Sequence, residues 1–129
     1  MVDYLIDTNI IADYLGARLP VECLEKIDKI MGSNPYTSVI CKIETLSFNF
    51  PNDELIYAES FFNYLSVLDL SDDIVRQTIN IRRNKKIKTP DAIIASTAIV
   101  KNLILVTRNT KDFEDIQNLQ LYNPWIQTN

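Results

Sequence analysis

Four acidic side chains of this 129-residue chain each adjoin an apolar stretch that predicts a buried strand or helix. They are Asp7, Glu44, Asp91 and Asp112, in the segments Tyr-Leu-Ile-Asp-Thr-Asn at 4–9, Ser-Val-Ile-Cys-Lys-Ile-Glu at 38–44, Thr-Pro-Asp-Ala-Ile-Ile-Ala at 89–95 and Val-Thr-Arg-Asn-Thr-Lys-Asp-Phe at 106–113. A carboxylate in such a place is unfavourable unless it is paired or bound to a metal. Four that converge would offer the oxygen ligands that Mg²⁺ or Mn²⁺ prefers.

Each of these acids also has a structural explanation when it is considered alone. Asp7 could cap a helix that follows a strand, and Glu44 could be an exposed helix residue. Asp91 could interact favourably with a helix dipole, and Asp112 could cap its own short helix. The joint pattern is more specific than any one member, so it favours a shared cation site.

The composition narrows the chemistry further. The chain contains no histidine, which excludes a Ser-His-Asp triad, a Cys-His pair and the usual histidine-bearing zinc sites. Its net charge of −4 argues against a protein that coats nucleic acid non-specifically. Cys23 and Cys41 lack CxxC spacing, which predicts two reduced core thiols in a cytoplasmic protein. No apolar run reaches the ~18 residues of a membrane span, and the first residues do not resemble a signal peptide.

Strand and helix patterns alternate along the chain. Strands are expected at 4–6, 36–37, 67–70, 103–106 and 121–122, and helices at 8–15, 20–31, 38–46, 51–65, after Ser71, from Thr89 to Val100 and at 112–116. The inward-facing residues of three of these helices are predicted to include Leu24, Ile27, Ile30, Ile74, Val75, Thr78, Ile79 and the alanines of 92–100. This alternation predicts an α/β fold with a central, mainly parallel sheet flanked by helices.

Ligands of such sheets bind beyond the carboxyl ends of the strands. Asp7 directly follows the first strand, and Thr107, Asn109 and Asp112 follow the fourth. Glu44 must reach the same edge from the second turn of a helix, and Asp91 from the first turn of another. Thr89 is expected to cap that second helix, with Pro90 at its first position.

A basic stretch immediately precedes Asp91. Five of the 13 lysines and arginines fall within 82–88, namely Arg82, Arg83, Lys85, Lys86 and Lys88. Cations near the end of a helix are favourable to its dipole, so the stretch could be a solvated helix end. It could equally contact phosphates at the rim of a site that contains Asp91.

The order and spacing of these motifs resemble those of the PIN-domain family and, within it, those of the VapC-type toxin ribonucleases of toxin–antitoxin pairs. The resemblance covers nearly the whole chain. It rests on Ile-Asp-Thr-Asn at 6–9, Ser38 with Glu44, the run from Arg82 through Lys-Thr-Pro-Asp-Ala-Ile-Ile-Ala at 88–95, Leu-Val-Thr-Arg-Asn at 105–109 with Asp112-Phe113, and Asn-Pro-Trp at 123–125. It implies one PIN-like domain over 1–129 with three layers, α/β/α.

The resemblance also implies an activity. Asp7, Glu44, Asp91 and Asp112 would be the catalytic, metal-binding quartet of an Mg²⁺- or Mn²⁺-dependent endoribonuclease. Relatives carry the fourth acid at the position of either Asn109 or Asp112, so either residue could complete the site here. Thr8, Asn9 and Thr107 would orient the acids or water, and the cations of 82–88 would contact RNA phosphates.

Such a toxin is expected to pair with a small antitoxin and to form a homodimer. The aromatics of the helix at 51–65, Tyr57, Phe61, Phe62 and Tyr64, exceed what one buried face needs, so half are expected in the core and half on a partner or dimer surface. Two other functions stay open. One is a PIN nuclease that processes RNA outside a toxin pair, and the other is a non-catalytic module that binds RNA or protein.

Overall fold

Five short strands form the centre of the protein in the order β3-β2-β1-β4-β5, and every neighbouring pair is parallel. The computed structural model describes residues 2–126. The strands are β1 (Tyr4–Ile6), β2 (Tyr36–Ser38), β3 (Ser66–Leu68), β4 (Ile104–Val106) and β5 (Gln120–Tyr122). A sheet in which every pair is parallel requires crossover connections, and helices supply them here.

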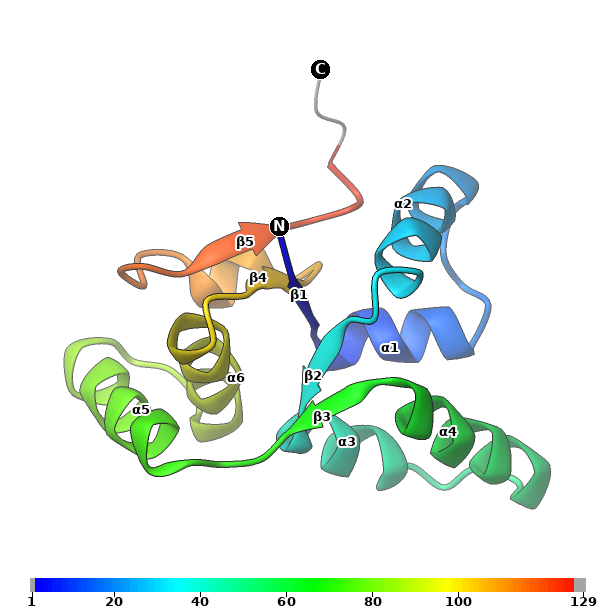
Figure 1. Ribbon diagram of the computed structural model, residues 1–129, viewed down its shortest axis with the longest axis horizontal. Helices are drawn as coiled ribbons and strands as arrows, with labels where there is room; N and C mark the ends of the chain where they lie inside the picture. Colours follow the sequence, from blue (N-terminus) through cyan, green and yellow to red (C-terminus); the bar gives the residue numbers. More distant parts are fainter. Residues whose placement is uncertain (1, 127–129) are drawn as a thin grey trace.

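Those helices cover both faces of the sheet, with α5 and α6 on one side and α1, α2 and α4 on the other (Figure 1). The helices are α1 (Thr8–Leu15), α2 (Val21–Met31), α3 (Val39–Leu46), α4 (Asn52–Tyr64), α5 (Asp72–Asn84) and α6 (Thr89–Val100), and a 3₁₀-helix, η1, spans Thr110–Phe113. The expected three-layer α/β/α fold is confirmed.

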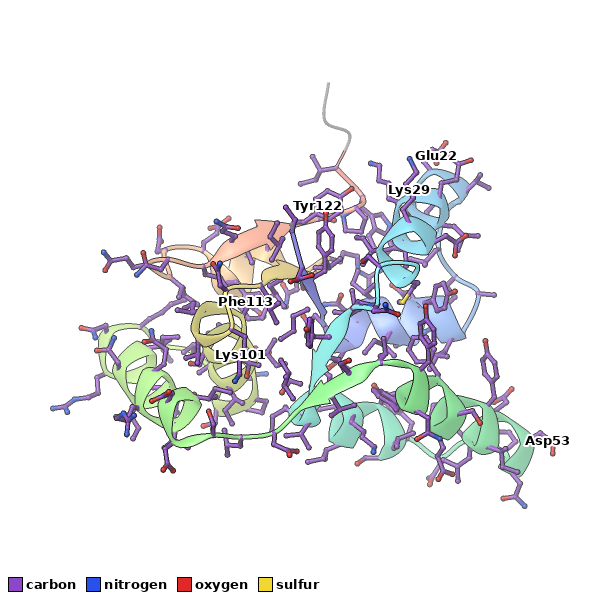
Figure 2. All side chains as sticks on the ribbon, viewed as in Figure 1. Glu22, Lys29, Asp53, Lys101, Phe113 and Tyr122 are labelled. Carbon is purple, nitrogen blue, oxygen red and sulfur yellow. The ribbon has the colours of Figure 1, made fainter. Side chains whose placement is uncertain are left out.

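The core lies between the sheet and these helices. Leu5 and Ile6 of β1 and Leu105 and Val106 of β4 are completely buried, as expected for central strands of a parallel sheet. Burying each such side chain contributes roughly 1.5–3 kcal/mol. Small buried residues of α6 (Ala92, Ala95, Ser96 and Ala98) let that helix pack closely. In Figure 2, Phe113 lies beside α6, whereas Glu22, Lys29 and Asp53 extend from the outer surfaces of α2 and α4.

The strand register aligns the residues that follow β1 and β4. Ile6 pairs with Val106, and the backbone N–H of Asp7 donates to the Val106 carbonyl at 3.0 Å. Thr107 N–H in turn donates to the Tyr122 carbonyl at 3.1 Å. Asp7 and Thr107 therefore leave the sheet side by side at its carboxyl edge.

Two details of α6 and η1 differ from the expectation. Thr89 is the first helical residue of α6 rather than its cap, and Lys88 occupies the cap position without a side-chain hydrogen bond. The first N–H groups of a helix have no partner inside it, so Pro90 fits the second position as well as the first. The short helix begins at Thr110, two residues earlier than expected, and it ends at Phe113.

The predicted inward faces of α2 and α5 were partly wrong. Ile74 and Thr78 are buried, but Val75 is 38% and Ile79 is 53% exposed. Ile74, Thr78 and Ile81 follow the spacing of one helix face, and Val75 and Ile79 lie about 100° farther around it. On α2, Ile27 and Ile30 are buried as expected, but Leu24 is 38% exposed.

The other predictions about packing hold. Phe62 is buried and Phe61 is partly buried, while Tyr57 and Tyr64 are more than half exposed. Both cysteines are buried free thiols. Among residues 2–126, no helix is both long and apolar enough to cross a membrane.

Candidate active site

Asp7 is the buried centre of the carboxyl edge. It directly follows β1 and is the N-cap of α1, and its side chain is held by three donors. Oδ1 accepts from the backbone N–H of Thr8 at 2.8 Å. Oδ2 accepts from the Thr107 hydroxyl at 2.8 Å and from the Asn9 amide at 3.3 Å. Both roles considered for Asp7 in the sequence therefore occur together: it caps a helix, and it faces the site.

Glu44 reaches this edge from α3. Ser38 ends β2 and caps α3 by accepting from the backbone N–H of Ile40 at 3.1 Å. The second turn of α3 then presents Glu44 at the surface, where its carboxylate accepts from the Thr8 hydroxyl at 2.7 Å. Thr8 thus connects Asp7, through its N–H, with Glu44, through its hydroxyl.

Asp91 and Asp112 lie on the other side of the site. Together with Lys88 and Lys111 they line one surface hollow of about 530 Å³. Asp112 does not cap its own helix, because its carboxylate accepts from the amide of Asn109. Asn109 is the residue that precedes η1, so it fixes Asp112 to the loop after β4.

The pKa values of two of the acids are shifted, mainly by burial and further by the charges of the other acids. Burial raises the pKa of Asp7 from 3.8 to about 6, and the charges of Asp91 and Glu44 add to this rise. The hydrogen bonds from Thr107 and Thr8 act in the opposite direction. Burial also raises the pKa of Asp91, with further increases from Asp112 and Glu44 and a decrease from Lys88.

All four candidate ligands are carboxylates, which are the oxygen ligands that a hard cation such as Mg²⁺ prefers. Among residues 2–126, however, no three acid or thiol side chains lie close enough together to hold one metal ion. The fold brings Asp7, Glu44 and Asp91 into one electrostatic neighbourhood, and joint coordination of a cation stays a prediction.

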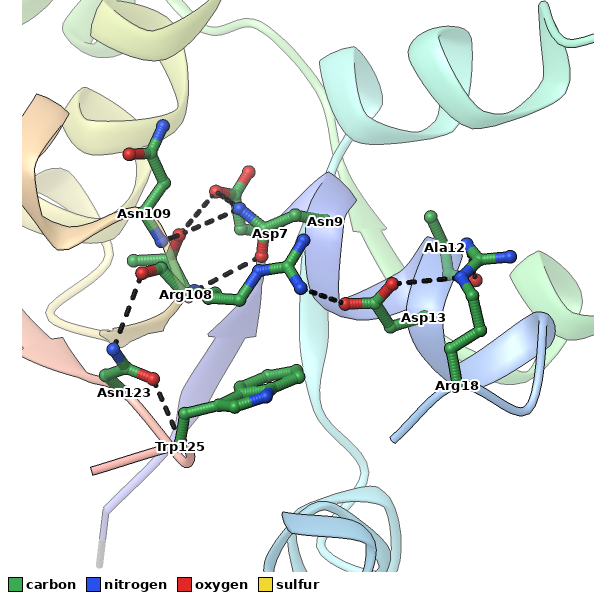
Figure 3. A network of polar contacts seen from close by, with 10 residues as sticks. Asp7, Asn9, Ala12, Asp13, Arg18, Arg108, Asn109, Asn123 and Trp125 are labelled. Atoms are coloured by element: carbon green, nitrogen blue, oxygen red, sulfur yellow. Dashed lines mark hydrogen bonds and ion pairs between the residues drawn. The ribbon is translucent and has the colours of Figure 1, made fainter. Parts of the chain in front are cut away.

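A second polar network supports the Asp7 side from behind (Figure 3). The backbone N–H of Arg108 donates to the side-chain carbonyl of Asn9 at 3.2 Å. The Arg108 guanidinium lies 3.1 Å from the buried carboxylate of Asp13 and 5.1 Å from the ring centre of Trp125. Arg18 binds the other oxygen of Asp13 at 3.3 Å. This network fixes Asn9, which in turn contacts Asp7 and Thr107.

Sequence reasoning found Thr8, Asn9, Thr107 and Asn109 but missed Asp13 and Arg108. A usable signal existed, because Asp13 falls on the apolar side of α1 with Ile10 and needs a cationic partner there. In the sequence, Arg108 lies between Thr107 and Asn109, which were both identified. Only the fold shows that it turns toward α1.

The basic stretch comes to the rim of the site. Arg82, Lys85, Lys86 and Lys88 line the hollow that contains Asp91 and Asp112, and Arg83 lines an adjoining one. Lys111 joins this rim from η1. It was missed because a lone lysine beside Asp112 has no distinguishing pattern in the sequence.

A family model described as the PIN domain matches residues 4–119. The chain therefore belongs to the PIN domain family. Two similar proteins are Ribonuclease VapC2 from Haemophilus influenzae strain Rd and Ribonuclease VapC from strain 86-028NP. Each is 28% identical over an alignment that covers 98% of this chain and the whole of that protein.

Solved structures give the same fold. A toxin–antitoxin complex from Klebsiella pneumoniae has a chain that is 27% identical, with a TM-score of 0.78, over 95% of this chain and 98% of that one. VapBC2 from Rickettsia felis, bound to a DNA fragment from its promoter, is 26% identical with a TM-score of 0.79 and the same coverage. DNA-bound VapBC from Salmonella typhimurium reaches a TM-score of 0.81 over 96% and 99% of the two chains at 23% identity, which concerns the fold alone.

Proposed function

We propose that this chain is a metal-dependent endoribonuclease and the toxin of a toxin–antitoxin pair. One observation carries the proposal. A buried carboxylate, Asp7, is held by Thr8 and Thr107 at the carboxyl edge of the sheet, within electrostatic reach of Glu44 and Asp91. The two relatives that match over their whole length are named ribonucleases. By similarity to them, we propose RNA hydrolysis as the reaction of this acid cluster.

Asp7, Glu44, Asp91 and Asp112 would hold Mg²⁺ or Mn²⁺. When bound, such a cation supplies a more acidic water as the nucleophile and neutralises charge on the leaving oxygen of the phosphodiester. The chain itself supplies orientation. Thr107 and Asn9 fix one oxygen of Asp7, the Thr8 N–H fixes the other, and the Thr8 hydroxyl holds Glu44.

Asp112 is proposed as the fourth acid, with Asn109 as its neutral support. The Asn109 amide donates to Asp112, and its backbone N–H donates to the Thr107 hydroxyl at 3.0 Å. Asp112 is therefore tied, through Asn109, to the same hydroxyl that orients Asp7. Its charge lies beside Asp91, so it would complete the open side of the site.

The cationic rim would bind the RNA backbone. Arg82, Lys86 and Lys88 are exposed, and they line the hollow that contains two of the acids. Lysine and arginine contacts to phosphates position a nucleic acid without reading its sequence. The rim therefore accounts for RNA affinity, although the net charge of the chain is −4.

A protein partner follows from the solved relatives. The Klebsiella structure is a toxin–antitoxin complex, so we propose a small cognate antitoxin that blocks the acids, together with a homodimer of one PIN-like domain over 1–129. A hollow between α1, α3 and α4, lined in part by the exposed Phe48 and Tyr57, offers an apolar surface for such contacts.

The test is cleavage of a mixed RNA pool by the purified chain. Cleavage should require a divalent cation, stop with excess EDTA and return when Mg²⁺ or Mn²⁺ is added. Since the chain has no histidine, imidazole titration cannot contribute to the pH profile. Full activity in excess EDTA would remove metal-dependent hydrolysis. A chain that binds RNA with every cation but never cleaves it would instead be a binding module.

A further inference from the structure

Beyond the cationic rim lies a groove of about 370 Å³ whose walls are mostly amides. Gln77, Asn80 and Asn84 come from α5, and Gln117 and Asn118 come from the loop after η1. The apolar residues Ile81 and Ile116 also line it. Asn84 also donates to the Asn80 backbone carbonyl at the end of α5, and Asn118 occupies a turn with φ +72°. Among residues 2–126, the side-chain amides of Gln77, Asn80 and Gln117 have no such structural role, because they donate no hydrogen bond and form no helix cap.

The groove continues directly from the proposed active site. Lys85 lines both the hollow that contains Asp91 and Asp112 and the amide groove. Asn84 lines the groove and also the adjoining hollow that is formed by 82–87. A chain that leaves the acids along the cationic rim therefore passes next over the amides.

The chemistry changes along this path. The rim is rich in lysine and arginine, which bind phosphate, whereas Lys85 is the one cation among the described residues that line the amide groove. That groove also includes the carboxylate of Asp115, which repels phosphate. Amides present a donor and an acceptor side by side, the arrangement that pairs with the edges of nucleobases. Single-stranded RNA is read through such edges.

We propose that the amide groove binds the bases of a single-stranded RNA segment next to the cleaved bond and sets a base preference there. The inference rests on the proposed ribonuclease function and adds a specificity site to it. Gln77, Asn80 and Gln117 would contact the base edges, and the partly exposed side chain of Ile116 would contact a base face. The acids and the rim would act on any sequence.

The variants follow from the local structure. Asn80→Ala removes one amide but retains its backbone carbonyl, which accepts from Asn84 at 2.8 Å. Gln117→Ala removes a second amide from the opposite wall. Asn118 is left intact because its φ is +72°, a conformation that asparagine tolerates better than alanine. The matched control pair, Asn52→Ala with Asn63→Ala, removes two exposed amides from α4, on the other side of the sheet.

The experiment maps cleavage of a random-sequence RNA library by sequencing the fragment ends. It compares the wild type, the double variant Asn80→Ala with Gln117→Ala (the groove pair) and the control pair. Wild type should show a base preference on one side of the cut. The groove pair should flatten that preference by about tenfold, with total cleavage and melting temperature unchanged, and the control pair should behave as wild type. Binding of the same library to Asp7→Asn and to Asp7→Asn with the groove pair should show the same loss of preference.

Other results would overturn the inference. One is a wild-type enzyme that shows no base preference beside the cut. Another is a groove pair that keeps the base preference in both cleavage and binding. A groove pair that keeps the preference but no longer binds the antitoxin would assign the groove to a protein partner instead. A wild-type chain that cleaves nothing would remove the proposed function, while the binding comparison would still decide the role of the groove.

Discussion

The two sides of the acid cluster are built differently. On the Asp7 side, a buried carboxylate has three donors, and its supports continue through Asn9 to Arg108 and Asp13. On the Asp91 side, the acids line an open hollow together with long cationic side chains such as Lys88 and Lys111. The first side is ordered by the protein itself. The second has few internal partners, of which the Asn109 amide that donates to Asp112 is one.

This difference indicates that the two sides of the acid cluster have different functions. On the closed side, hydrogen bonds orient both oxygens of Asp7, which would lower the ordering that binding of a cation must supply. The open side leaves room for a polymer to enter and leave. We therefore expect substitutions on the closed side to affect both stability and catalysis, and substitutions on the open side to affect binding and rate with little change in stability.

The largest effect is expected from the acids that flank Asp7. Glu44→Gln and Asp91→Asn should each lower kcat by more than about 100-fold, because even residues outside a metal's ligand set cost about 10–100-fold. Both acids are at least partly exposed, so melting temperatures should change little. Asp112→Asn should cost less, since Asn109 would remain beside it. Single-turnover cleavage measures all three, and equal losses at the three positions would contradict the graded arrangement.

The pH dependence of stability should separate the two sides next. The pKa of Asp7 is raised from 3.8 to about 6, so between these values the folded protein binds more protons than the unfolded chain. In metal-free buffer, stability should therefore fall as the pH rises through both pKa values, by about 3 kcal/mol in total at 1.4 kcal/mol per unit. The loss is complete about one unit above the folded value of about 6.

Asp7→Asn should remove the part of this pH dependence that Asp7 contributes, while the raised pKa of Asp91 leaves a dependence of the same sign. Denaturant unfolding of both proteins across the range measures the difference. Asp53→Asn, a substitution of an exposed acid on α4, controls for the removal of one negative charge. A wild type and an Asp7→Asn variant with parallel stability profiles would show that Asp7 has an ordinary pKa.

The Arg108 network should give an intermediate effect. Arg108→Ala leaves the buried Asp13 carboxylate with Arg18 alone, and it removes the cation–π interaction with Trp125. It should lower the free energy of unfolding by about 1–3 kcal/mol, and Arg108→Lys should restore part of this loss. Arg76→Ala is the matched control, because its ion pair with Asp73 is exposed and contributes less than about 1 kcal/mol. Equal losses for Arg108→Ala and Arg76→Ala would contradict a supporting role for the network.

The smallest effect is expected on the open rim. Lys86→Gln with Lys88→Gln should weaken RNA binding and reduce the slope of log affinity against log salt by about 0.7 for each phosphate that is no longer neutralised. The melting temperature should stay the same. Lys29→Gln with Lys101→Gln, at two other exposed sites, is the control. If both pairs give the wild-type slope, 82–88 is only a solvated helix end.

The sequence predicted the parts of this molecule that depend on local patterns. Strand and helix periodicity was sufficient for the parallel sheet, and the positions of Asp7 and Asn109 after strands were sufficient to place them at one edge. What it could not predict depends on long-range geometry. Arg108 turns toward Asp13 because β4 lies beside β1, and the groove between Asn80 and Gln117 exists because the loop after η1 lies near α5. Neither pairing has a periodic signal in the chain.

The most direct test of the account is Asp7→Asn, with cleavage and thermal melting measured in EDTA and in Mg²⁺. The wild type should cleave RNA only with Mg²⁺, and Mg²⁺ should raise its melting temperature. Asp7→Asn should fold, melt higher than wild type in EDTA because a buried charge is gone, respond little to Mg²⁺ and lose orders of magnitude in rate. An Asp7→Asn protein that cleaves RNA as fast as the wild type would contradict the central claim.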